Sequence, residues 1–262
     1  MSCKGERTNI LGIGISAINM DDAIATIDGW IEQREPNYVC ITGAHGVVES
    51  RKDARLRDIY ERAGLVTPDG IPLVWMSRWL GARRVERVYG PDLMREISAR
   101  SPARGYRHFY YGGTPGVADQ LAAALTTSNP GLNVVGTLCP PFRALTPEED
   151  AQMVEQINST APDIVWVGLG APKQEYWMAS HIGRINAPVI IGVGAAFDFL
   201  AGTKKQAPVW MQRHGLEWLF RLCAEPRRLW RRYAYIVPAF LVLGASQLIN
   251  HALRAQVPAS SR

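Results

Sequence analysis

The feature that most constrains the fold is a repeated pattern of a short apolar run, a loop of small residues and a helical segment. The pattern occurs over residues 37–63, 107–125, 163–181 and 189–198. Strands that alternate with helices are typical of βαβ units and a mostly parallel sheet. The runs are apolar throughout, as expected for strands covered on both faces. The sequence therefore predicts an α/β fold with helices on both faces of the sheet.

Three further segments predict smaller elements. Residues 10–18 form a short apolar run with glycines, which indicates a strand rather than a targeting segment. Residues 136–145 contain two adjacent prolines and predict an ordered loop. Residues 148–158 are predicted to be helical, with Thr146 as the N-cap and Glu149 at capping-box spacing.

Positive charge is concentrated near the C-terminus. The 262-residue chain has a net charge of +5, but residues 204–254 contain nine Lys and Arg residues against two acids, which leaves −2 for the rest. From Gln206 onward, tryptophan and tyrosine are interleaved with arginine at helical spacing. We therefore expect an α/β domain over residues 1–205 and a basic, aromatic appendage over residues 206–262.

Several explanations of this appendage are open. It could be an amphipathic helix with a solvated basic face, or a helix lying on anionic lipid. A nucleic acid would also attract it, but that would not explain polar groups at the strand ends, and the chain has no known reader motif. We expect a membrane surface as the partner, and no nucleic acid. The run 235–249 is about 15 residues long, shorter than the roughly 20 needed to span a bilayer, and predicts a docked or monotopic element.

The cysteines and acids give no sign of a metal site. The four cysteines show neither paired nor metal-ligand spacing, so we expect reduced thiols in the cytosol; they are Cys3, Cys40, Cys139 and Cys223. The chain also lacks the Asp-x-Asp triplet that often holds a metal for a nucleotide diphosphate. The sequence therefore predicts no metal and no cofactor.

Asp69 is the first candidate for chemistry. It lies in Thr67-Pro-Asp-Gly, between a short apolar segment and an apolar helix predicted over residues 71–80. Pro-Asp-Gly is also ordinary turn chemistry. Ligands of such folds collect at the carboxyl ends of strands, and Asp69 is the only ionisable group of this turn. A carboxylate there could act as a general base.

Two glycine loops could hold a phosphate. Gly112 and Gly113 follow one predicted strand, where a close backbone and the next helix N-terminus favour an anion, although a tight turn explains them equally well. The second loop, Gly168-Leu-Gly-Ala-Pro, leads into Lys173 and Gln174. The lysine could neutralise a phosphate and the glutamine could bind a sugar or base, while Glu175 could simply favour the helix dipole.

Two more residues remain ambiguous. Asp198 is the one acid in a small-residue strand end, where close backbone packing is an alternative explanation. Arg87 could contact a diphosphate or could be an ordinary surface arginine.

These residues together resemble the WecG/TagA/CpsF glycosyltransferase family, known as glycosyltransferase family 26. The resemblance extends from about Ile10 to Phe240. It rests on several long motifs in the same order: Thr67-Pro-Asp-Gly-Ile-Pro-Leu-Val-Trp, Pro140-Pro-Phe-Arg, Val167-Gly-Leu-Gly-Ala-Pro-Lys-Gln-Glu, Gly192-Val-Gly-Ala-Ala-Phe-Asp, Gly215-Leu-Glu-Trp-Leu-Phe-Arg-Leu and Glu225-Pro-Arg-Arg-Leu-Trp-Arg-Arg-Tyr.

The resemblance implies a Rossmann-like fold and metal-independent, inverting transfer of a sugar from a UDP-sugar to a polyprenyl-diphosphate-linked sugar. It implies Asp69 as the base, with Gln174 and Arg87 as ligand contacts. A basic appendage that closes over the site and docks on the membrane would use Arg221, Arg228 and Arg231. The protein would then act peripherally at the cytoplasmic face of the inner membrane, in cell-surface or exopolysaccharide biosynthesis. A homo-oligomer is left open.

One position departs from the family pattern. Many members carry Thr-x-Asn at the first strand end, where the Asn contacts the ligand. Here Gly43 stands at that position, with Thr42 and His45 beside it. Thr42 is therefore a substrate-binding candidate, and the donor is not assumed to be N-acetylmannosamine. A dinucleotide-dependent oxidoreductase would share the fold, but its spaced glycine fingerprint is absent.

Overall fold

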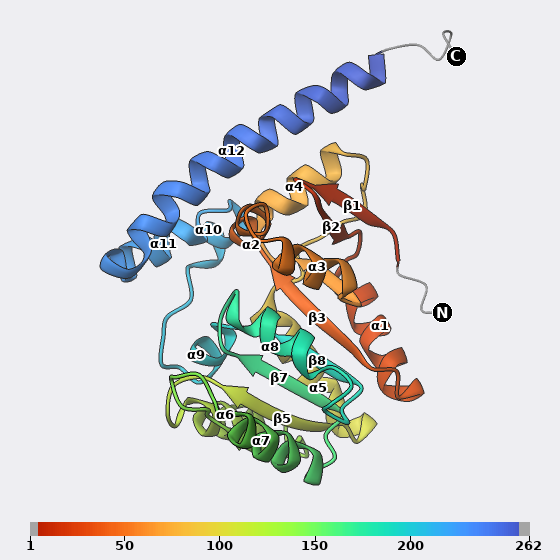
Figure 1. Cartoon of the computed structure of the whole chain (residues 1–262), viewed down its shortest axis with the longest axis vertical. Helices are drawn as coiled ribbons and strands as arrows, with labels where there is room; N and C mark the ends of the chain where they lie inside the picture. The colour runs from red at the N-terminus through yellow and green to blue at the C-terminus, as the bar shows by residue number, and fades with distance from the viewer. Residues whose placement is uncertain (1–4, 257–262) are drawn as a thin grey trace.

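The computed structural model describes residues 5–256 and places a six-stranded parallel sheet at the centre of the molecule (Figure 1). Its strand order is β4-β3-β8-β7-β5-β6. The strands are β3 (Asn37–Thr42), β4 (Leu65–Pro68), β5 (Arg107–Gly112), β6 (Asn133–Leu138), β7 (Ile164–Gly168) and β8 (Val189–Gly192). The predicted α/β fold with a mostly parallel sheet is confirmed.

Helices cover both faces of the sheet, and successive residues of each strand are therefore buried against helices on alternate faces. In β3, Tyr38 and Cys40 belong to one hydrophobic cluster, whereas Val39 and Ile41 belong to the other. The first cluster is closed by α2 (Ala44–Ser50), α3 (Ala54–Arg62), α4 (Ile71–Trp79), α7 (Pro147–Ser159) and α8 (Lys173–His181). The second is closed by α1 (Met20–Gln33), α5 (Gly90–Arg104), α6 (Val117–Ser128) and α9 (Ala196–Leu200).

The N-terminal apolar run forms a hairpin instead of the single predicted strand. Strands β1 (Arg7–Ile10) and β2 (Ile13–Ser16) pair antiparallel. Leu11 and Gly12 between them both have positive φ angles, of 52° and 97°. Two consecutive residues with positive φ make the tight turn whose twist matches that of the flanking strands.

The prediction of a loop over residues 136–145 is wrong in its first part. Residues 136–138 belong to β6, an edge strand that pairs parallel with β5. Gly136 is required by packing, since a Cβ there would lie only 2.5 Å from the Phe109 ring. The helix predicted after this loop is confirmed as α7, and Thr146 and Glu149 form the predicted capping box.

The appendage forms three helices, α10 (Val209–Arg213), α11 (Glu217–Ala224) and α12 (Pro226–Gln256). The expectation of a short element over residues 235–249 is wrong, because α12 continues through both Pro238 and Gly244. Gly244 allows a close approach to α4: a Cβ there would lie 3.2 Å from Met76 Sδ. By length and composition alone, residues Pro226–Arg254 could cross a membrane.

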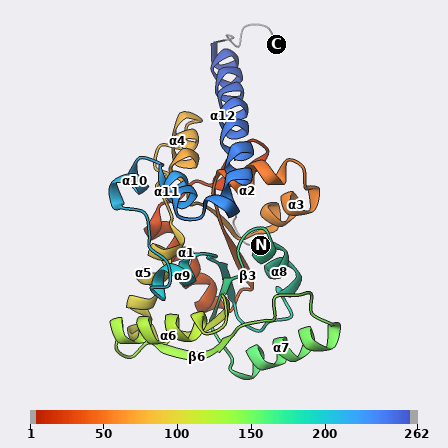
Figure 2. The ribbon, with the colours of Figure 1, turned by 90° about the vertical axis from the view of Figure 1, so that its left-hand side faces the viewer.

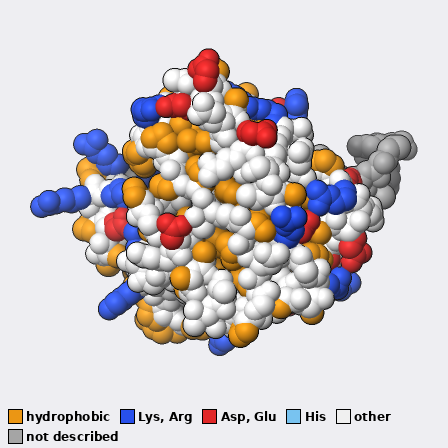
Figure 3. Space-filling view, turned by 90° about the horizontal axis from the view of Figure 1, so that it is seen from below, with side chains coloured by type: hydrophobic (Ala, Val, Ile, Leu, Met, Phe, Trp, Pro, Cys, Tyr) orange, Lys and Arg blue, Asp and Glu red, His pale blue; other side chains and the backbone are white. Residues whose placement is uncertain are grey.

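The long helix lies at one end of the molecule, and its C-terminal half extends past the α/β body (Figures 1 and 2). It is attached through buried Ile236 and Phe240. Gln247 continues the attachment, since its side chain bonds to the backbone of Leu11 and Asn9. On the opposite end, basic and acidic side chains of both signs are scattered among small apolar patches (Figure 3).

Three cysteines are free thiols, namely Cys40, Cys139 and Cys223. Cys3 lies outside the described residues, as do the outer limits of the two predicted domains. The division at residues 205 and 206 remains a proposal.

Candidate functional site

Asp69 follows the edge strand β4 and precedes α4. Its backbone N–H donates to the carbonyl of Thr42 at 2.9 Å, so the carboxyl ends of β3 and β4 are held together. Gly70 is the N-cap of α4, in extended conformation. This short connection fixes Asp69 at the strand edge where ligands of parallel sheets bind.

The carboxylate of Asp69 lies in an unusual environment. Its Oδ1 atom is buried and has no hydrogen-bond partner among the described residues. Burial raises the pKa of Asp69 to about 6, and the negative charge of Glu217 adds to the rise. The charges of Arg87 and Arg221 and a backbone hydrogen bond from Gly90 oppose it. A carboxyl group with this pKa is suited to exchange a proton near neutral pH.

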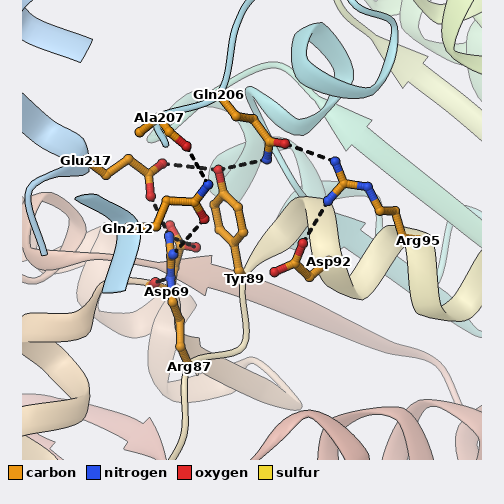
Figure 4. Close-up of polar contacts among 9 residues, drawn as sticks. All are labelled: Asp69, Arg87, Tyr89, Asp92, Arg95, Gln206, Ala207, Gln212 and Glu217. Atoms are coloured by element: carbon orange, nitrogen blue, oxygen red, sulfur yellow. Dashed lines mark hydrogen bonds and ion pairs between the residues drawn. The ribbon is translucent and has the colours of Figure 1, made fainter. Parts of the chain in front are cut away.

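Arg87 connects Asp69 to the appendage (Figure 4). Its Nε donates to the backbone carbonyl of Asp69, and its Nη2 lies 3.9 Å from Asp69 Oδ1. The same Nη2 donates to Glu217 Oε2 at 2.6 Å, and Nη1 donates to Gln212 at 3.3 Å. Tyr89 completes the arrangement, since its ring centroid lies 3.9 Å from the guanidinium and its hydroxyl donates to Glu217. The appendage is thus fastened directly over the candidate base.

Thr42 is buried at the end of β3, and its hydroxyl lies 2.9 Å from the Tyr60 hydroxyl. Behind it, Gly46 leaves room for that pair, since a Cβ there would be 2.3 Å from Thr42 Oγ1. Near these residues, burial and the charges of Arg232 and Arg221 lower the pKa of the half-buried His45 to about 4.

Gln174 and Glu175 both point inward at the start of α8. Gln174 Nε2 donates to Glu175 Oε1 at 3.3 Å, whereas Gln174 Oε1 and Glu175 Oε2 are buried without a partner in the described part of the chain. Burial raises the pKa of Glu175 to about 7, and Glu49 adds to the rise. The capping explanation of Glu175 missed this environment, although three consecutive polar residues after a glycine turn were a signal of it.

The second glycine region is tightly packed. A Cβ on Gly112 would lie 2.8 Å from the Gly168 backbone, and the Gly113 N–H donates to the Gly168 carbonyl at 3.0 Å. Strand packing explains Gly112, and Gly113 is explained by its φ of 77° and by Val117, whose Cβ would lie 3.2 Å from a Cβ at Gly113. The bond to Gly168 also occupies one of the N–H groups proposed for a phosphate. Lys173 is exposed at the adjacent helix start, with its Nζ 4.7 Å from the Phe142 ring centroid.

The remaining candidates have local partners. Asp198 Oδ2 forms an ion pair with Lys204 at 3.2 Å, and Asp198 Oδ1 accepts from Thr203. Arg228 pairs with Glu225, and Arg231 lies over the Trp230 ring. Among the three appendage arginines predicted to bind the substrate, Arg221 is half-buried and its charge lowers the pKa of Asp69, whereas Arg228 and Arg231 are exposed.

Within residues 5–256, no group of three or more His, Cys, Asp or Glu side chains is arranged to hold a metal ion. The metal-independent reaction implied by the family resemblance remains a prediction.

A parallel α/β sheet with a half-buried acid at its edge, covered by a basic helical appendage, agrees with a glycosyltransferase. The chain belongs to the glycosyl transferase WecG/TagA/CpsF family, whose sequence profile matches residues 8–254. The chain is 31% identical over 181 residues to a Bacillus subtilis protein named N-acetylglucosaminyldiphosphoundecaprenol N-acetyl-beta-D-mannosaminyltransferase, covering 69% of this chain and 68% of the relative. A Bacillus spizizenii protein of the same name is 26% identical over 203 residues, covering 78% and 77% respectively.

Proposed function

We propose that this glycosyltransferase moves a hexose or N-acetylhexosamine from a UDP-sugar to a sugar linked to a polyprenyl diphosphate, with inversion at the anomeric carbon. The observation that carries the proposal is the half-buried carboxyl of Asp69, whose Oδ1 is buried and whose pKa is raised to about 6 at the edge of a parallel sheet. The names of the two Bacillus relatives support a lipid-linked acceptor. The pathway would be cell-surface or exopolysaccharide biosynthesis.

In the proposed reaction, Asp69 takes the proton of an acceptor hydroxyl. The hydroxyl oxygen forms a bond to the anomeric carbon from one side while the bond to the diphosphate breaks on the other. UDP leaves with additional negative charge, which fixed positive groups must stabilise. Arg87 and Arg221 are the proposed groups, because both act on the pKa of Asp69 through their charge. Gln174, with its unpartnered buried Oε1, is the proposed contact to a sugar hydroxyl or amide.

The membrane is the expected source of the acceptor. We place the protein at the cytoplasmic face of the inner membrane as a peripheral protein, attached through α12. The body contacts of α12 reach Gln247, and the residues described beyond that contact are those up to Gln256. At 1.5 Å per residue they span about 14 Å, less than half the roughly 30 Å hydrocarbon core. A docked helix fits this attachment better than a spanning one.

The proposal is tested with a panel of UDP-sugars and a polyprenyl-diphosphate-linked sugar in detergent, with the product followed by mass and its anomeric configuration by NMR. We expect one donor to add a single sugar with inversion. Transfer from no UDP-sugar would overturn the proposal, and a retained configuration would remove Asp69 from the role of base.

A further inference from the structure

Helix α4 has two faces of opposite character. Leu73 and Met76 are buried against the body. On the other side, Trp75 and Trp79 are 43% and 65% exposed, one helical turn apart. Two exposed tryptophans on one helix face form an apolar surface that water does not favour. Indole rings are enriched where one part of a side chain meets apolar material and the other meets water.

The surroundings of these rings are basic. Residues 75–86 contain Arg78, Arg83 and Arg84 against one acidic residue, Glu86. All three arginines are exposed. Tryptophan next to clustered arginine is typical of a surface that contacts anionic lipid, because the rings enter the interface while the guanidinium groups meet the headgroups. The opposite end of the molecule carries charges of both signs (Figure 3).

This surface lies beside α12. The two helices meet where Gly244 approaches Met76, and both views place them at the same end of the molecule (Figures 1 and 2). The body-facing side of α12 is occupied, but other side chains of its second half are free of the body. These exposed apolar residues are Leu241, Val242, Ile249 and Leu253.

We propose that α4 is a second membrane contact, and that Trp75 and Trp79 enter the interface of an anionic bilayer together with the outer face of α12. Two membrane-contacting helices fix the orientation of the α/β body relative to the bilayer, whereas a single helix would allow the body to rotate about that helix. Helix α4 begins directly after Asp69 and Gly70. The position of α4 on the bilayer would therefore also fix the distance between the Asp69 carboxylate and the bilayer surface. At 1.5 Å per residue, the nine residues of α4 set that distance to about 14 Å at most. This consequence for catalysis rests on the proposed function, whereas the lipid contact itself does not.

The test measures partition of the full chain into phosphatidylcholine vesicles with and without phosphatidylglycerol. Trp75→Ser combined with Trp79→Ser should weaken partition into the anionic vesicles by about tenfold or more, since the variant lacks the two indole rings that would be partly buried in the bilayer interface. Arg83→Gln combined with Arg84→Gln should weaken it by about fivefold per arginine at low salt. Phe142→Ser is the matched control, because that ring is 95% exposed but belongs to the loop before α7. It should leave partition unchanged.

The proposal is overturned if the double tryptophan variant partitions like the wild type, or if Phe142→Ser weakens partition equally. It is also overturned if the tryptophan variant changes only the oligomeric state in solution, since α4 would then face a second copy of the chain. Lipids brominated in their chains should quench the wild-type fluorescence more than that of the variant, and equal quenching would contradict insertion.

Activity separates this proposal from the proposed function. The double tryptophan variant should transfer sugar to a detergent-solubilised acceptor at the wild-type rate and lose turnover with acceptor in vesicles. If the wild type transfers no sugar in either format, the proposed function fails, while the vesicle partition still decides the lipid contact.

Discussion

Asp69 and Asp198 each follow the carboxyl end of a strand of the parallel sheet, but the groups that surround the two acids differ. Asp69 follows β4, and its buried Oδ1 accepts no hydrogen bond within the described part of the chain, although Arg87 Nη2 lies 3.9 Å away. Asp198 follows β8, and both its oxygens are engaged, by Lys204 and Thr203. Burial raises the pKa of Asp69 to about 6. A strand end therefore places an acid near a ligand, while its neighbours decide whether it can exchange protons there.

The neighbours of the two acids come from different distances along the chain. Lys204 and Thr203 lie within six residues of Asp198. The groups that act on Asp69 include Glu217 and Arg221, which reach it only because the appendage folds back over the sheet. The environment of Asp69 therefore depends on tertiary contacts, whereas that of Asp198 is formed largely by residues close to it in the sequence. Substitutions in the two regions should have effects of very different size.

The largest effect is expected from Asp69→Asn, which removes the proposed base and keeps the shape of the side chain. The loss of a general base should lower kcat by about 10² to 10⁴. Asp198→Asn is the matched control and should change kcat by roughly a few-fold at most, since its ion pair is partly exposed. Steady-state kinetics with the best UDP-sugar and circular dichroism of both variants make the measurement. Equal losses in the two variants would break the contrast between the acids.

Arg87→Ala should have the next largest effect. It removes a positive charge that lies 3.9 Å from Asp69 and leaves Glu217 without its 2.6 Å partner. We expect kcat/KM to fall by about 10², as for the loss of one group that stabilises developing charge. The ascending limb of the pH profile should also move to higher pH, because the charge of Arg87 lowers the pKa of Asp69.

Arg87→Lys is the control for this variant. An ammonium keeps the charge but lacks the planar fork that joins the Asp69 carbonyl, Gln212 and Glu217. It should restore the position of the pH limb and only part of the rate. Full recovery of the rate by lysine would show that the fork has no role.

Glu217→Gln should change the pH dependence more than the maximal rate. In the wild type, kcat/KM should rise with pH through about 6 as Asp69 loses its proton. Removal of the negative charge of Glu217 lowers the pKa of Asp69, so the limb should move to lower pH. The variant should then keep a larger fraction of its maximal kcat/KM at acidic pH. A limb that stays in place, or moves to higher pH, would mean that another group titrates.

The same shift affects stability. The pKa of Asp69 is higher in the folded protein than its ordinary value near 3.8, so the protonated form favours folding. This contribution is present below about pH 4 and is lost as the pH rises through about 6. Asp69→Asn should flatten that part of the stability profile, measured by urea unfolding at several pH values.

Local sequence was a good guide wherever local interactions decide the structure. The parallel strands, the capping box of Thr146 and Glu149 and the helical segment within residues 163–181 were all predicted. Tertiary contacts explain the failures. Gly136 was taken for a loop residue because nothing nearby in the sequence shows the Phe109 ring above it. The run 235–249 was taken for a short element because nothing nearby in the sequence shows that Gly244 contacts Met76 within a longer helix.

The site followed the same rule. The Asp-Gly turn and the polar residues after the glycine loop marked Asp69 and Gln174 as candidates. The inward orientation of Glu175 and the bond from Arg87 to Glu217 could not be predicted, because they depend on which helices meet over the sheet. Glu217 and Arg87 are separated by 130 residues in the chain.

The smallest effect is expected near Asp198, from the substitution Lys204→Met. Lys204 joins Asp198 at 3.2 Å and Glu225 at 3.4 Å, so it is a second link between the body and the appendage. Its side chain is 42% exposed, and exposed ion pairs contribute about 0 to 1 kcal/mol. The free energy of urea unfolding should therefore fall by no more than about 1 kcal/mol, and the difference should shrink at high salt. The maximal rate should remain that of the wild type. A loss of several kcal/mol, or a loss of turnover, would show that the appendage is held by Lys204 as firmly as by Arg87, and the two regions would then no longer differ in kind.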